Sequence, residues 1–457
     1  MKRFLKVEYF LISAVILFHL LSNFLFLKYE RGIYLLSGAP HSHLTTYIAV
    51  ALGMAPPSFE GYTLLHFFSV FLNKILGCSL LSFRLSSTLG FLLLLVAIYL
   101  LISLLFSSRI YGVVTATFVS CLPGNIFYSR IFAEPILFVA IIFITVYCII
   151  KFYIYGDKFC FFFYLVFLYV GTQMFHKDVS FRMLYLLYLS GPLLFLLNFV
   201  RKKRCNFLRY FLLVMAFFIA WGNLGIHSYV ISECRRFSYP TTVSGWGDFF
   251  YFYIGEILTG VGLIPSIIFI VSLIYLLFLA KEIKTLKGVN GVYFLGSLFI
   301  AFFVLLAVSK KQVFYVTPLF SLVGIFSAIG LVDLCKNKKK GLILFLTFGV
   351  LNLSLWCDSA VEPFWKKAYD MRTGNYFHFP YMYRVRSNKL EKSYLSSKKL
   401  IYQEIEREDN RIEYIYRELE QILAGRQEYN ANVRSLSLLE YLFENHLCAK
   451  VKEYKSA

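Results

Sequence analysis

Long runs of apolar residues, separated by short polar clusters, form the dominant pattern of this chain. Residues 9–27 and 85–106 contain no charged side chain, and each approaches the ~20 residues with which a helix crosses ~30 Å of hydrocarbon. The pattern predicts an all-α integral membrane protein with about eleven transmembrane helices, at 9–27, 85–106, 109–124, 132–150, 159–175, 180–200, 207–228, 262–280, 291–309, 313–335 and 341–357.

The first apolar run follows Lys2, Arg3 and Lys6, which is also the pattern of a secretory signal. The run is too long for one, and no small-x-small cleavage site follows it, so we expect a retained first span. Only 16% of the residues are charged, against roughly a quarter in soluble domains. This deficit supports the membrane interpretation.

The net charge of +20 lies mostly in short clusters between spans, such as RKKR at 201–204 and KNKKK at 336–340. These clusters fall on one side, which the positive-inside rule makes cytoplasmic. The sequence therefore predicts a multi-pass plasma (inner) membrane protein with a cytoplasmic amino terminus, an extracytoplasmic tail and no nucleic-acid partner. The nine cysteines show no CxxC and no Cys/His spacing, so we expect no metal and no cofactor.

Two outer loops stand out, at 28–84 and 229–261. The first contains apolar stretches at 44–54 and 62–76, which we expect to be helices lying in the membrane interface. The second is rich in aromatic residues and glycine, as is common at a membrane boundary.

A polar tail follows the spans, which divides the chain into a transmembrane domain at 1–358 and a helical tail at 359–457. The segment 391–424 predicts one amphipathic helix, because its apolar residues recur at helical spacing: Ile401, Ile405, Ile412, Ile415, Leu419 and Ile422. This helix either packs on its own small domain or binds a protein partner as a coiled coil.

Four segments, in this order, carry a resemblance to a known family: LLHFFSVFLNKILG, SLLSFRLSSTLGFLLLLVAIYLL, PGNIFYSRIFAEP and SKKQVFYVTPLFSLVGIFSAIGL. Over roughly residues 1–335 the chain resembles the lipid-linked-sugar glycosyltransferases of the GT-C fold, which include protein O-mannosyltransferases and the aminoarabinose transferase of lipid A. The resemblance implies a GT-C-type membrane domain. It also implies metal-independent, inverting transfer of a sugar from a polyprenyl-phosphate donor to a lipid, glycan or protein acceptor on the extracytoplasmic face.

The first outer loop departs from the family pattern. Family members usually carry an acidic residue there, which acts on the acceptor nucleophile, whereas this chain reads GAPHSHLTTYIAVALGM. His43 stands near the expected aspartate, and Glu30 and Glu60 are carboxylates of the same loop. These three residues are the candidate catalytic bases.

A polyprenyl-phosphate donor presents its phosphate at the interface, so transfer requires cations that hold the leaving phosphate. The sequence places five on the predicted outer side, with two tyrosines as further donors: Arg84, Arg130, Lys177, Lys310, Lys311, Tyr128 and Tyr315. The structural alternative is that these side chains only extend to the lipid headgroups.

Two other functions stay open. The altered acidic motif and the amphipathic tail would suit a non-catalytic GT-C-like scaffold or accessory subunit of a membrane complex. A lipid or sugar transporter would carry charge or broken helices deep in its spans, whereas the spans here keep their charges at their ends.

Overall fold

The computed structural model of the 457-residue chain describes residues 64–77, 80–122, 135–173, 207–223, 263–276, 291–308, 317–334, 396–423 and 431–445, together with scattered single positions. All regular secondary structure in these ranges is helical. The chain divides into two compact units: Met1–Phe18, Gly90–Tyr128 and Glu134–Phe379 form the first, and His19–Leu89, Ser129–Ala133 and Pro380–Ala457 form the second.

Helix α5 (Leu80–Leu105) begins in the second unit and continues into the first. The other described helices of the first unit are α6 (Arg109–Ser120), α8 (Pro135–Tyr155), α9 (Lys158–Gln173), α11 (Phe207–Asn223), α14 (Leu263–Ile274), α15 (Gly291–Val308) and α16 (Thr317–Leu334). Each helix coincides with a predicted apolar segment. The helical character and the approximate positions of these segments are therefore confirmed.

Two described helices, Leu81–Leu105 and Ile136–Tyr155, are long and apolar enough to cross a membrane, and the remaining apolar helices are shorter. The predicted number of about eleven spans is therefore not confirmed. The predicted segments 180–200 and 341–357 lie outside the described residues, as does 9–27 apart from three single positions.

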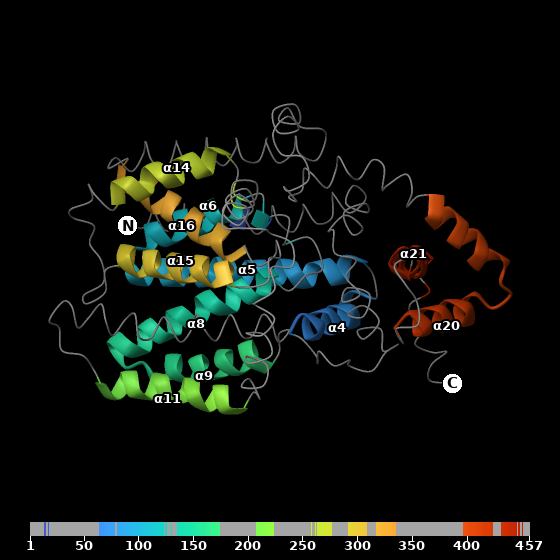
Figure 1. Ribbon diagram of the computed structural model, residues 1–457, viewed down its shortest axis with the longest axis horizontal. Coiled ribbons are helices and arrows are strands. Elements are labelled where there is room, and N and C mark those ends of the chain that lie inside the picture. The colour runs from blue at the N-terminus through green and yellow to red at the C-terminus, as the bar shows by residue number, and fades with distance from the viewer. Residues whose placement is uncertain are drawn as a thin grey trace. The chain divides into compact units, whose positions relative to one another are not determined.

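Helix α16 forms the centre of the first unit and packs against α6, α14, α15 and α8 (Figure 1). Its side chains at Leu319, Leu322 and Ile329 are fully buried. The contact with α14 is close because small polar residues meet there. The Ser272 hydroxyl donates to the Ser327 carbonyl over 3.3 Å. The Ser327 hydroxyl donates to the Val323 carbonyl of its own helix over 2.8 Å and also contacts the Pro265 carbonyl at 3.3 Å. Small residues and hydroxyl contacts of this kind are typical of helix packing in lipid.

Helices α8, α9 and α11 lie side by side (Figure 1). Large apolar side chains of α9 and α11 face outward, with Phe159 78%, Phe162 60% and Phe207 68% exposed. Water would penalise such a surface, whereas lipid would not. The outward aromatic residues therefore indicate that this face contacts hydrocarbon.

The turn between α8 and α9 is fixed by charged groups. Lys151 and Asp157 form an ion pair of 3.1 Å, and the Asp157 carboxylate accepts the backbone N–H groups of Phe159 and Cys160 at 3.0 and 3.2 Å. Arg209 donates to the carbonyls of Tyr153 and Ile154, at 3.1 Å each, which satisfies the end of α8.

The tail is not one helix. Residues 396–407 are helical, the chain turns at 408–410, and α20 (Arg411–Leu423) follows. Asn410 begins α20 because its Oδ1 accepts the Glu413 backbone N–H over 3.3 Å, while its Nδ2 donates to the Glu413 carboxylate over 3.0 Å. The prediction of a single helix over 391–424 is wrong for this reason.

A third tail helix, α21 (Ala431–Glu444), packs against α20. The predicted apolar stripe turns inward, since Ile405, Ile415 and Leu419 are fully buried, as are Leu438 and Leu442 of α21. The stripe is thus covered within the chain itself. This packing favours the small-domain alternative over a coiled coil along the same stripe.

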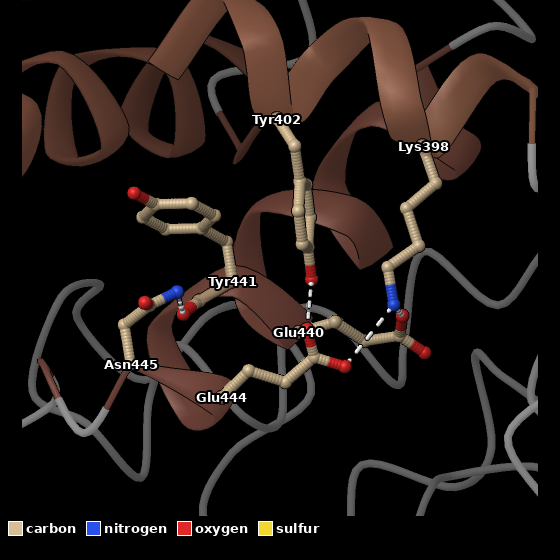
Figure 2. Close-up of polar contacts among 6 residues, drawn as sticks. All are labelled: Lys398, Tyr402, Glu440, Tyr441, Glu444 and Asn445. Carbon is tan, nitrogen blue, oxygen red and sulfur yellow. Dashed lines mark hydrogen bonds and ion pairs between the residues drawn. The ribbon is translucent and has the colours of Figure 1, made fainter. Parts of the chain in front are cut away.

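Polar contacts join the tail helices at one edge (Figure 2). Lys398 pairs with Glu440 and Glu444 at 2.5 and 3.2 Å. Tyr402 stacks edge-on against Tyr441 at 4.9 Å between ring centroids, and its hydroxyl donates to Glu444 over 2.9 Å. On another side, Arg434 pairs with Glu404 and Glu418 at 3.0 and 2.7 Å.

Candidate functional site

Arg84 is the one predicted site residue that falls within the described part of the chain. The proposed bases His43, Glu60 and Glu30 lie outside it, as do the other proposed binding residues Tyr128, Arg130, Lys177, Lys310, Lys311 and Tyr315. Their convergence on one site stays a prediction.

Arg84 lies in the second turn of α5, and its side chain is only 1% exposed. A guanidinium this deeply buried requires polar surroundings, because transfer of a charge into an apolar interior is very unfavourable. The neighbouring turns of α5 supply them with four buried hydroxyl side chains, those of Ser82, Ser86, Ser87 and Thr88. From Phe91 onward the helix carries no charged residue and is mostly apolar. The first turns of α5 therefore form a buried polar end on a hydrophobic helix.

The polar end of α5 contacts a second predicted outer segment. The Thr88 hydroxyl donates to the Ser129 carbonyl over 2.9 Å and contacts the Arg84 carbonyl at 3.3 Å. Residues four apart share one face of a helix, so Arg84 and Thr88 lie on the side of α5 that meets Ser129. The motifs SLLSFRLSSTL and PGNIFYSRIFAEP, which sequence analysis places on the same side of the membrane, are therefore in contact at this point.

Helix α4 (Leu64–Leu76) has a reversed distribution of polar and apolar side chains. Ser69 and Asn73, one turn apart, are buried at 0% and 8% exposure, whereas Phe71 and Ile75 are 59% and 61% exposed. A helix in water would show the opposite arrangement. The outward apolar face suits lipid, as predicted for an interfacial helix in this loop, and the inward polar face lies toward α5.

The contact between the two helices is polar. The Ser82 hydroxyl of α5 donates to the Asn73 Oδ1 of α4. Asn73, Ser82 and Thr88 are not among the residues predicted from the sequence. The available signal was the spacing of Ser69 and Asn73, which places two polar groups on one face of an otherwise apolar helix.

A second polar cluster lies in the first unit. Asp333 near the end of α16 accepts hydrogen bonds from Tyr275 over 2.7 Å and from Tyr111 over 3.4 Å. Asp333 links α6, α14 and α16, and it is not among the residues predicted from the sequence. The predicted topology places this end of the helices on the cytoplasmic side, so we assign the cluster to helix packing.

No protein-family model and no curated protein matches the chain. Similar solved structures include the crystal structure of ArnT from Cupriavidus metallidurans in the apo state, at 12% identity and a TM-score of 0.48. Another is the same protein bound to undecaprenyl phosphate, at 13% identity and a TM-score of 0.47. Each similarity covers 89% of this chain and 71% of the ArnT chain. Neither assigns a role to any residue of this chain.

Proposed function

We propose that this protein is a membrane glycosyltransferase of the GT-C type, which moves a sugar from a polyprenyl-phosphate donor to a lipid, glycan or protein acceptor on the extracytoplasmic face. The observation that carries the proposal is the burial of Arg84, at 1% exposure, within the polar end of α5. This residue lies in the segment whose sequence resembles the mouth of the second span in that family.

The chemistry requires a group that stabilises the charge developing on the leaving phosphate. A guanidinium is suited to this because it remains charged and binds phosphate through two parallel hydrogen bonds. In a buried site the attraction is stronger than in water, and the charge is already in place when the glycosyl bond breaks. Arg84 supplies such a cation, and Thr88 on the same face of α5 donates to the carbonyl of Ser129, the residue that Tyr128 and Arg130 flank in the sequence.

The acceptor must lose a proton as the new glycosidic bond forms, so an enzyme also needs a base. His43, Glu60 and Glu30 of the first outer loop remain the proposed candidates. Inversion at the sugar carbon belongs to the same proposal, because a single displacement by the acceptor needs no covalent intermediate on the protein.

The test is the binding of undecaprenyl phosphate to the purified full-length protein in lipid nanodiscs. Arg84→Met removes the charge at similar length, and Arg84→Lys keeps the charge but loses the planar pair of donors. We expect a loss of affinity on the order of tenfold to a hundredfold for Arg84→Met and a smaller loss for Arg84→Lys. Arg109→Met, at an exposed arginine that begins α6, is the matched control.

Wild-type affinity in Arg84→Met would assign Arg84 a packing role and remove the main support for the proposal. A transfer assay with the wild-type protein separates the enzyme from the scaffold. If the protein binds the lipid but cells lacking it show unchanged glycosylation of envelope lipids and proteins, the accessory subunit is the correct function.

A further inference from the structure

Asn73 carries an enclosed amide N–H that meets no hydrogen-bond acceptor among the residues that the structure describes. Its side chain is 8% exposed, and the Ser82 hydroxyl donates to its Oδ1. The Nδ2 atom is buried and has no partner in the part of the chain that the structure describes. Because Oδ1 already accepts a hydrogen bond, the group of this amide that lacks one is the Nδ2 donor.

An enclosed donor without an acceptor destabilises a fold, and native proteins keep few of them. An apolar side chain at position 73 would avoid the penalty and would match Leu65 and Leu72 on the same buried face of α4. A bound molecule that offers an acceptor would remove the penalty in a different way. The buried Nδ2 donor of Asn73 therefore indicates a ligand that supplies the acceptor.

The surroundings of Asn73 indicate the chemistry of that ligand. Ser82, which orients the amide, lies two residues before the buried Arg84 in the same helix. The cation of this polar end matches an oxygen-rich anion, because a guanidinium binds phosphate oxygens through charge-assisted hydrogen bonds. The outer face of α4 exposes Phe67, Phe71 and Ile75 at 49%, 59% and 61%, so an apolar tail can extend along the same helix.

We propose that Asn73 is a further ligand-binding residue, whose Nδ2 donates to a phosphate oxygen of the polyprenyl-phosphate headgroup. The Ser82 hydroxyl is a positioning group, since it holds Oδ1 and so turns Nδ2 toward the ligand. This inference rests on the proposed function and adds to it a neutral donor on α4, in addition to the cation of the polar end of α5.

The experiment measures binding of two lipids to the full-length protein in nanodiscs, undecaprenyl phosphate and the uncharged alcohol undecaprenol. Asn73→Ala removes the donor, and Asn73→Asp replaces it with a carboxylate oxygen of the same shape. Ser82→Ala releases the orientation of the amide. Asn445→Ala is the matched control, because that tail amide has its own acceptor, the Tyr441 carbonyl, at 2.9 Å. Thermal unfolding of each ligand-free variant is recorded in parallel.

We expect Asn73→Ala to bind undecaprenyl phosphate on the order of tenfold more weakly. Asn73→Asp should bind more weakly still, because its charge repels the phosphate, and Ser82→Ala should be intermediate. Undecaprenol binding and Asn445→Ala should be unchanged. The ligand-free Asn73→Ala protein loses an enclosed donor but also the acceptor of the buried Ser82 hydroxyl, so we expect its stability to change little.

Wild-type affinity for undecaprenyl phosphate in Asn73→Ala would overturn the inference, as would an equal loss for the phosphate and the alcohol. A loss of ligand-free stability with unchanged affinity would make Asn73 a packing residue and would also overturn it. If Arg84→Met weakens binding and Asn73→Ala does not, this inference fails while the proposed function stands. If the wild type does not bind undecaprenyl phosphate, both fail.

Discussion

The hydroxyl of Tyr275 donates a 2.7 Å hydrogen bond to the carboxylate of Asp333, which links the end of α14 to the end of α16. The two residues are 58 positions apart in the chain, and the bond adds a polar contact to the packing of α14 on α16. Tyr111 of α6 approaches the other oxygen of the same carboxylate at 3.4 Å, near the limit of a hydrogen bond.

This difference in distance predicts unequal effects of removing the two hydroxyls. Tyr275→Phe should lower the free energy of unfolding by about 1 kcal/mol, because a partly exposed hydrogen bond to a carboxylate is lost. Tyr111→Phe, matched in chemistry, should have a smaller effect. Chemical denaturation in detergent followed by tryptophan fluorescence gives both values. Equal effects would mean that Tyr111 and Tyr275 bind Asp333 equally well.

Helices α14 and α16 approach each other so closely that we expect one added methyl group at position 330 to push them apart. A Cβ on Gly330 would collide with the side chain of Ser272 and lie 2.8 Å from its Cα, which is backbone and cannot rotate away. Gly330→Ala should therefore destabilise the protein by about 1–3 kcal/mol.

Gly296 of α15 supplies the control, because a Cβ there would meet nothing within 4 Å. Gly296→Ala should be neutral or stabilise the protein by up to ~1 kcal/mol, as alanine favours a helix over glycine. Thermal unfolding of the two variants in the same detergent compares them. A stable Gly330→Ala protein would show that the two helices can move apart without penalty.

The helices of the first unit were predictable because hydropathy is a local property, as the agreement of α8, α9, α15 and α16 with the predicted segments shows. Helix α5 begins at Leu80 rather than at 85, because its first turns are polar and resemble a loop in sequence. In the tail, the helix predicted from the sequence was too long instead of too short. Apolar residues keep a helical spacing across the break at 408–410, so the pattern hides the start of α20, although Asn410 and Glu413 are a recognisable capping pair.

The candidate site was predictable only in part. Arg84 was found because a charge at the mouth of an apolar segment is visible in the sequence. Asn73 and Ser82 were missed because their significance lies in a contact between two helices, which periodicity does not encode. Asp333 was missed for a similar reason, since Tyr111 lies 222 positions away.

The turn between α8 and α9 predicts a dependence of stability on pH. The ion pair with Lys151 and, to a lesser degree, the Cys160 backbone N–H lower the pKa of Asp157 below its usual value of 3.8. Because the folded pKa is the lower one, the stabilisation is fully present above the unfolded pKa and is lost as pH falls through the folded pKa.

Asp157→Asn isolates this contribution, because the amide oxygen can still accept the backbone N–H groups while the ion pair is lost. We expect the variant to be less stable than the wild type at neutral pH and equally stable below the folded pKa of Asp157. Unfolding curves recorded from pH 7 down to acid conditions test this. A difference that persists unchanged at the lowest pH would assign the effect to the helix cap instead.

The last prediction concerns the tail, where two adjacent lysines have different surroundings. Lys398 pairs with Glu440 and Glu444 of α21, and its side chain is 14% exposed, whereas Lys399 is exposed to solvent. An ion pair that joins three side chains and is partly shielded from water contributes more than an isolated surface pair, for which the median is about 0–1 kcal/mol. Lys398→Ala should therefore loosen the packing of residues 396–407 on α21, while Lys399→Ala should not.

Hydrogen–deuterium exchange of the full-length protein measures this directly, because exchange reports local opening of helices. In Lys398→Ala we expect faster exchange of the amides of 396–407 and α21, with exchange in α8 and α16 unchanged. High salt should reduce the difference between the variant and the wild type, since it screens the same contact. Tyr402→Phe should give a smaller increase of the same kind, because it removes only the hydroxyl that donates to Glu444 and keeps the ring against Tyr441. Identical exchange in Lys398→Ala and Lys399→Ala would show that the buried residues Ile405, Leu438 and Leu442 hold the tail helices together without help from the ion pairs.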